Sequence, residues 1–119
     1  MLKNVRALGK PTAICTIYDA IPVLGDAERA ALAAFNDVIS RAAISAGLPL
    51  IDLRVTCAHV DDYSPISPIE PSVVGGAKIA DAICRMVAVH DFRSAHGRVG
   101  VTAAHAGSGT AAANAFAVS

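Results

Sequence analysis

The chain has 119 residues and a mass of 12.1 kDa, which is the size of one domain. Apolar residues make up 54% of it and charged residues 17%, so it has enough apolar side chains to form a buried core. The formal net charge is zero and aromatic residues are scarce, which excludes the basic surfaces and stacking rings that bind nucleic acid. No apolar run approaches the roughly 20 residues that span a bilayer, and the first residues do not resemble a secretion signal. We therefore expect a cytoplasmic globular protein that neither binds nucleic acid nor spans a membrane.

The first predicted elements are a short helix, a strand and a long helix. Residues 1–11 have the pattern of a short amphipathic helix, and residues 11–18, PTAICTIY, form an almost continuous run of apolar and β-forming residues. Such a run is typical of a strand that is covered on both faces, as in parallel sheets. Residues 26–47 then predict a helix, with Asp26 as its N-cap and Gly47 at its end. The apolar face expected for this helix has side chains at three- and four-residue steps: Leu32, Phe35, Ile39, Ala42 and Ala46.

A second strand is predicted at residues 48–53, LPLIDL. Strand, helix and strand in this order make a βαβ unit, whose two strands are parallel and whose crossover is right-handed. The sequence therefore predicts an α/β fold with at least two parallel strands.

A stiff loop and a last helix follow the second strand. Residues 54–71 show no sustained period, and three prolines spaced three apart restrict the backbone of this loop. Ser72 suits the N-cap of a helix that continues to residue 92. Gly75 and Gly76 each cost a helix about 1 kcal/mol relative to Ala, so they indicate close packing against a strand or loop. A phosphate-binding loop is the alternative, but a preceding strand and the Lys-Ser/Thr ending are missing.

The amino-acid composition of the chain changes at residue 94. Residues 94–119 are mostly small and show no period, so we expect a flexible tail after a domain at residues 1–93. His96 and His105 lie in this segment without acidic or cysteine neighbours and are poor metal ligands. We therefore predict no metal and no cofactor.

The three cysteines, Cys15, Cys57 and Cys84, are widely spaced and contain no C-x-x-C pair. We expect small buried thiols, because free cysteine behaves as a small apolar residue. A catalytic Cys57 with His59 as its base is the alternative, and it requires a fold that brings the two side chains together.

Four segments taken in order, TIYDAIP, FNDVISRAA, LPLIDLR and DYSPISPIEPSVVGGAKIADAI, resemble the C-terminal half of SGNH/GDSL-type hydrolases. The resemblance covers roughly residues 8–90 and excludes the tail. It implies ester hydrolysis, with a small acyl ester as the substrate. It also implies a partial flavodoxin-like three-layer fold, in which a βαβ unit with parallel strands is followed by a C-terminal helix.

In that family the loop before the last helix typically reads Asp-x-x-His-Pro and supplies the acid and the base of a catalytic triad. Ser67 and Glu70 stand at these two positions here, so the resemblance implies them as the candidate catalytic residues. A glutamate needs burial to become a base at neutral pH, whereas a histidine does not. Glu70 also suits a purely structural role, because a carboxylate near a helix N-terminus is stabilised by the helix dipole. The loop offers three other polar groups that can share the catalytic role: His59, Asp61 and Asp62.

The family's nucleophile lies in a Gly-Asp-Ser segment and its oxyanion donors include the Asn of Gly-x-Asn-Asp, and this sequence contains neither segment. Asn36 and Asp37 fall in the middle of the predicted helix, where we expect a helix-surface and packing position. Gly25-Asp26 is followed by Ala27. Two hypotheses remain: a hydrolase part that is weakly active or inactive without its N-terminal half, or a non-catalytic α/β domain. In the second case the domain forms a homodimer or binds another partner through an exposed sheet edge.

Overall fold

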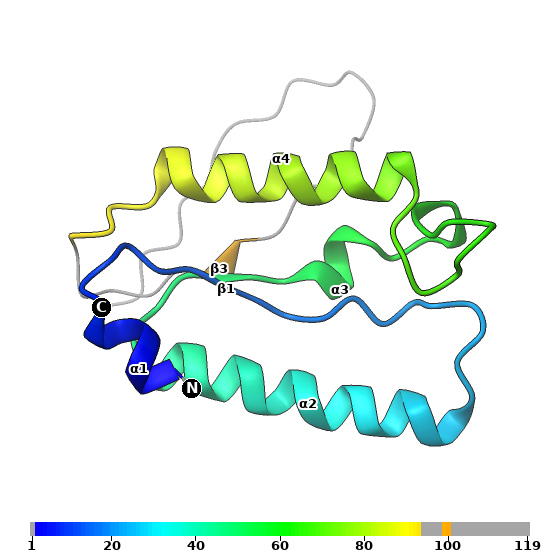
Figure 1. The fold of residues 1–119 in the computed structure, drawn as a ribbon, viewed down its shortest axis with the longest axis horizontal. Helices are drawn as coiled ribbons and strands as arrows, with labels where there is room; N and C mark the ends of the chain where they lie inside the picture. Colours follow the sequence, from blue (N-terminus) through cyan, green and yellow to red (C-terminus); the bar gives the residue numbers. More distant parts are fainter. Residues whose placement is uncertain (1, 94–98, 101–119) are drawn as a thin grey trace, which may run out of the picture.

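Helices alternate with short parallel strands in the computed structural model, which describes residues 2–93 and 99–100 (Figure 1). The chain first forms a short helix, as predicted, and then a βαβ unit followed by a further helix. The elements in chain order are α1 (Leu2–Ala7), β1 (Ile14–Cys15), α2 (Asp26–Ser45), β2 (Leu50–Ile51), α3 (Leu53–Thr56), the 3-10 helix η1 (Val60–Asp62), α4 (Val73–Val89) and β3 (Val99–Gly100).

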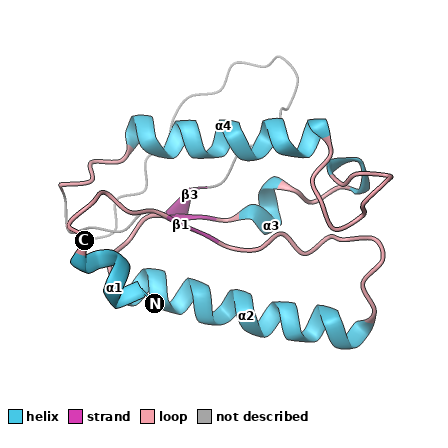
Figure 2. Cartoon of the chain, viewed as in Figure 1, coloured by secondary structure: helices cyan, strands magenta, loops and turns pink. Residues whose placement is uncertain are grey.

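The sheet has the order β1-β2-β3 and all its strands are parallel. Ile14 lies opposite Leu50, and Leu50 lies opposite Val99 on its other side. Figure 2 shows how little of the chain between the helices is regular strand. The predicted α/β class with parallel strands is confirmed, and the finer flavodoxin-like arrangement stays a prediction.

Each strand is two residues long, much shorter than the predicted segments 11–18 and 48–53. The reason is that side chains take over the hydrogen bonds where the strands would continue. The amide of Leu53 donates to Oγ1 of Thr16 (2.8 Å) instead of to a backbone carbonyl. Asp52 then acts as the N-cap of α3 and ends β2.

The two long helices cover opposite faces of the strands, with α2 on one side and α4 on the other (Figure 1). The core between α4 and the sheet contains Ile51, Leu53, Ala82 and Met86. A second apolar cluster lies beyond the carboxyl ends of the strands and contains Ile21, Cys57 and Tyr63.

Helix α2 differs in two ways from its prediction. Its N-cap is Gly25, and Asp26 is the first helical residue, so the predicted capping residue was wrong by one position. Phe35, expected on the buried face, is 63% exposed, whereas its neighbour Asn36 is fully buried. The helix ends where predicted, because Gly47 adopts a left-handed backbone conformation with φ of 62°.

Helix α4 begins as predicted. Ser72 is its N-cap, and Oγ of Ser72 accepts a hydrogen bond from the amide of Gly75 (3.1 Å). A Cβ atom at Gly75 would overlap the backbone carbonyl of Asp62, which confirms the predicted close packing there. Gly76 faces open space, so close packing explains only one glycine of the pair.

The predicted tail contributes a described strand, because Val99–Gly100 pairs with β2. The prediction for the rest of 94–119 lies outside the described residues, as do His96 and His105. Within residues 2–93 and 99–100, no helix is both long and apolar enough to cross a membrane.

Candidate functional site

The loop between α3 and α4 lies at the carboxyl ends of β1 and β2, where open α/β sheets place their sites. It is fastened where its two ends meet. Tyr63 and Pro71 form an isolated antiparallel bridge, and the amide of Ser72 donates to the carbonyl of Asp62 (2.8 Å). Oγ of Ser72 also donates to the carbonyl of Asp61 (2.7 Å). Hydrogen bonds between its two ends therefore already close this loop, and the prolines stiffen it further.

Ser67 and Glu70, the residues predicted as catalytic, lie on one tight turn. The amide of Glu70 donates to the carbonyl of Ser67 (2.8 Å), and the amide of Ser64 donates to the carbonyl of Glu70 (2.8 Å). Oγ of Ser64 accepts from the amides of Ile66 (3.2 Å) and Ser67 (3.3 Å). Glu70 is exposed and Ser67 is half-buried, and neither side chain has a hydrogen-bond partner among the described residues. The fold thus brings their backbones together, but no hydrogen bond joins their side chains.

Tyr18 reaches the same turn from the end of β1 and was not predicted as a site residue. Its hydroxyl donates to the carbonyl of Ile69 (2.9 Å), and its ring contacts that of Tyr63 edge-on at 5.5 Å between centroids. Burial raises the pKa of Tyr18, and the nearby Cys57 and the charge of Glu70 add to that increase. The sequence feature that could have identified Tyr18 is its position directly after the apolar run of the first predicted strand.

A second polar group connects the carboxyl ends of β1 and β2. Oγ1 of Thr16 donates to Oδ1 of Asp52 (3.0 Å), and Arg54 binds the same carboxylate through Nε (2.8 Å) and Nη2 (2.6 Å). Hydrogen bonds from Arg54 lower the pKa of Asp52, in spite of the opposing effect of burial. Because the carboxylate is fully engaged by its own chain, its role here is to hold the two strand ends together.

The alternative site groups of the loop do not converge. His59 and Asp61 are exposed, whereas Asp62 is almost fully buried. Oδ1 of Asp62 lies 2.6 Å from Nζ of Lys78, and its Oδ2 accepts from the amide of His59 (3.1 Å). Asp62 therefore anchors the loop to α4 rather than facing a substrate.

Cys57 is buried, as predicted, and its Sγ lies 4.0 Å from the carbonyl oxygen of Gly75. Burial raises the pKa of its thiol, which is the opposite of what a nucleophilic cysteine needs. The same prediction was wrong for Cys84, which is exposed, and Cys15 is half-buried. In the described part of the chain, no group of three or more His, Cys, Asp or Glu side chains is placed to hold a metal ion.

An apolar cavity of about 720 Å³ adjoins the loop, but Ser67 and Glu70 do not line it. Its walls are mostly prolines and valines, including Pro65, Pro68 and Val74. Among the polar side chains in the wall, Ser64, Ser72 and Tyr63 form hydrogen bonds within the chain, whereas the carboxylate of Asp61 is exposed and forms none with the described residues. The cavity therefore presents an apolar surface with one carboxylate in its wall.

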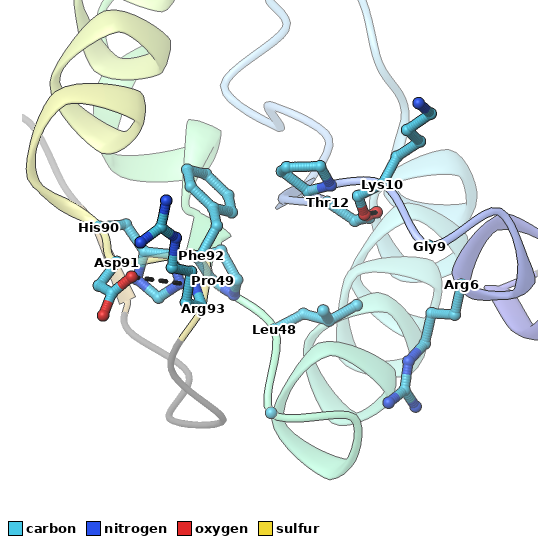
Figure 3. Close-up of a pocket in the computed structure, with 12 residues that line it drawn as sticks. Arg6, Gly9, Lys10, Thr12, Leu48, Pro49, His90, Asp91, Phe92 and Arg93 are labelled. Atoms are coloured by element: carbon cyan, nitrogen blue, oxygen red, sulfur yellow. Dashed lines mark hydrogen bonds between the residues drawn. The ribbon is translucent and has the colours of Figure 1, made fainter.

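A second cavity, of about 560 Å³, lies at the amino ends of the strands, away from this loop (Figure 3). Basic side chains line it, among them Arg6, Lys10 and Arg93. Figure 3 shows that the charged ends of Arg6 and Lys10 point away from each other. The amide of Arg93 donates to Oδ1 of Asp91 (3.0 Å), which adds negative charge beside the basic group. These side chains do not form a convergent anion site.

No protein-family model, no curated protein and no solved structure matches this chain. The resemblance to SGNH/GDSL-type hydrolases therefore rests on the segments quoted above.

Proposed function

We propose that this chain is the C-terminal part of an SGNH/GDSL-type ester hydrolase that acts on small acyl esters. The observation that supports the proposal best is the turn that joins Ser67 and Glu70 at the carboxyl ends of parallel strands. These are the positions at which the family carries its catalytic acid and base.

By itself the chain has weak ester turnover or none. Acyl transfer needs an activated nucleophile and donors that stabilise the oxyanion. Oγ of Ser67 has no base within hydrogen-bonding distance among the described residues, and Glu70 is exposed. A second segment that supplies a Gly-Asp-Ser nucleophile and the oxyanion donors completes the site.

The test is hydrolysis of p-nitrophenyl acetate by the purified chain, compared with Glu70→Gln and with Glu28→Gln, an exposed glutamate on α2. We expect all three proteins to match the buffer rate. Adding a protein that carries the Gly-Asp-Ser segment should give turnover that Glu70→Gln abolishes and Glu28→Gln retains. Turnover by the chain alone that only Glu70→Gln abolishes would show a complete site. Turnover in the mixture that survives Glu70→Gln would refute the proposed role of this residue.

A second candidate function is that of a non-catalytic α/β domain that binds through its sheet edge. The observation that favours it is that β1 pairs with β2 on one side and with no described strand on the other. Stable association without ester turnover, alone or in the mixture, would favour this function over the first.

A further inference from the structure

One side of β1 is available for pairing. The amide of Ile14 donates to the carbonyl of Pro49 (2.9 Å), and that of Thr16 to the carbonyl of Ile51 (3.0 Å). Because successive residues of a strand direct their backbone groups to opposite edges, the amide and carbonyl of Cys15 point away from β2. No described strand pairs with them. An edge of this kind is a template for a further strand.

The side chain of Asn36 occupies the backbone hydrogen-bonding groups at the carboxyl end of this edge. Its Oδ1 accepts from the amide of Ile17 and its Nδ2 donates to the carbonyl of Ile17, both at 2.8 Å. Ile17 is two residues after Cys15 and directs its backbone to the same side. Helix α2 therefore reaches over the open edge, and the part left free for pairing is centred on Cys15.

The flank of α2 beside Asn36 is apolar and exposed. Phe35 is 63% exposed and Val38 is 64% exposed. A right-handed helix that joins β1 to β2 by a right-handed crossover turns Phe35 from Asn36 toward the open edge, whereas Val38, about 200° round the helix from Asn36, faces away from the sheet. The same geometry turns Ile44, on the opposite flank, toward β2.

The flank of α4 on this side is apolar as well. Ile79 and Tyr18 both pack against each of the two buried clusters, and Cys15 packs against the first, which puts the Ile79 side of α4 beside β1. Ile83 and Val87 continue the same row at four-residue steps, and they are 41% and 61% exposed. The ion pair of α4, between Asp81 and Arg85, lies on the other flank (2.7 Å).

We propose that a second copy of this chain covers this open-edge surface, which consists of the outward side of β1 with Phe35, Ile83 and Val87. The two β1 strands pair antiparallel around a two-fold axis perpendicular to the sheet. Sheets that mix parallel and antiparallel pairs are common.

The two-fold axis explains why a second copy fits. It keeps the two faces of the sheet apart, so α2 meets α2 and α4 meets α4. Each apolar flank then meets its own copy, and the three residues that define the surface are uncharged, with Glu28 two turns before Phe35 on the same flank of α2. The formal net charge of zero adds no long-range repulsion between copies. The inference rests on the second candidate function, binding through the sheet edge, and does not depend on ester hydrolysis.

The test is the molar mass of the full chain in solution, measured by light scattering after size exclusion in the presence of a reductant, because Cys84 is exposed. We expect twice the 12.1 kDa of one chain. Phe35→Lys and Val87→Lys should each give monomers, whereas Ile44→Lys, also on an exposed apolar residue of α2, should keep the dimer. Circular dichroism shows whether each variant is folded.

Two results would overturn this inference. The first is a wild-type monomer at high micromolar concentration. The second is a dimer that both lysine variants keep, which would place the contact elsewhere. Ester turnover is a separate readout, so failure of the dimer and failure of the hydrolase proposal are distinguishable.

Discussion

The side-chain amide of Asn36 forms with the backbone of Ile17 both hydrogen bonds that a neighbouring strand would otherwise form. Asn36 is fully buried, whereas the sequence pattern gave it a helix-surface and packing position. An asparagine in the middle of a helix is neither a strong helix former nor an apolar core residue. Its value here comes from satisfying a strand edge that lies 19 residues earlier in the chain.

Replacing this amide should destabilise the fold. In Asn36→Leu the amide and carbonyl of Ile17, a residue that is 41% exposed, lose their hydrogen-bond partners, and each lost bond costs about 0.5–1.5 kcal/mol. We expect the urea midpoint to fall accordingly with little change in slope. Asp37→Ala is the control, because Asp37 forms a solvent-exposed ion pair with Arg41, and pairs of this kind contribute little to stability. Equal midpoints for the two variants would contradict the role of Asn36.

The two adjacent glycines of α4 should respond in opposite directions to the same change. Gly75→Ala places a methyl group on the carbonyl of Asp62, and backbone atoms cannot move aside without shifting the loop. Gly76→Ala meets nothing within 4 Å and gains helix propensity of about 1 kcal/mol. Thermal unfolding should show a lower Tm for the first variant and a higher Tm for the second. Stabilisation by both changes would refute the close contact at Gly75.

Helices α1, α2 and α4 could be predicted from the sequence because their signals are local, whereas α3 and η1 lie where a strand end and a loop were predicted. Ser72 as N-cap, Gly47 at a helix end and the apolar period of α4 all depend on neighbouring residues. The short strands could not be predicted, because Thr16 and Leu53 end the ladder through a bond across 37 residues. The spacing of apolar residues indicates which residues favour burial, but it does not indicate which segment of the chain packs against them.

The candidate site was predicted only in part, for a related reason. The resemblance located Ser67 and Glu70, and the structure places both on one turn. Tyr18 and the group around Asp52 were missed, since each acts through partners that are distant in the sequence. The exposure of Glu70 also depends on the packing of the loop, which the spacing of prolines does not determine.

Asp52 should contribute to the loss of folding stability at acid pH. Because Arg54 lowers the folded-state pKa of Asp52, the contribution is present above the ordinary value of about 3.9 and is lost as the pH falls through the folded value. In Asp52→Asn we expect lower stability at neutral pH and a smaller loss between neutral and strongly acidic pH. Urea unfolding at several pH values measures this difference. An acid loss as large as that of the wild type would show that Asp52 is not responsible.

Tyr63 should contribute to the loss of folding stability at alkaline pH. Burial raises its pKa to about 12, from an ordinary value of about 10. The folded state thus favours the protonated phenol, so this contribution is present below pH about 10 and is lost as the pH rises toward about 12. In Tyr63→Phe the fold loses the bond from the hydroxyl to the carbonyl of Cys57 (2.8 Å), which costs about 1 kcal/mol at neutral pH. The alkaline loss of stability should be smaller in this variant than in the wild type.

Tyrosinate absorbance can test this assignment directly. The difference between the wild-type and Tyr63→Phe titrations isolates the phenol of Tyr63, and its midpoint should lie near 12 while the protein remains folded. Tyr18→Phe is the matched control, because it removes the other tyrosine of the edge-on pair and leaves Tyr63 in place. A Tyr63 midpoint near the ordinary value of about 10 would mean that solvent reaches its hydroxyl. In that case the bond to Cys57 does not hold the loop closed over the second apolar cluster.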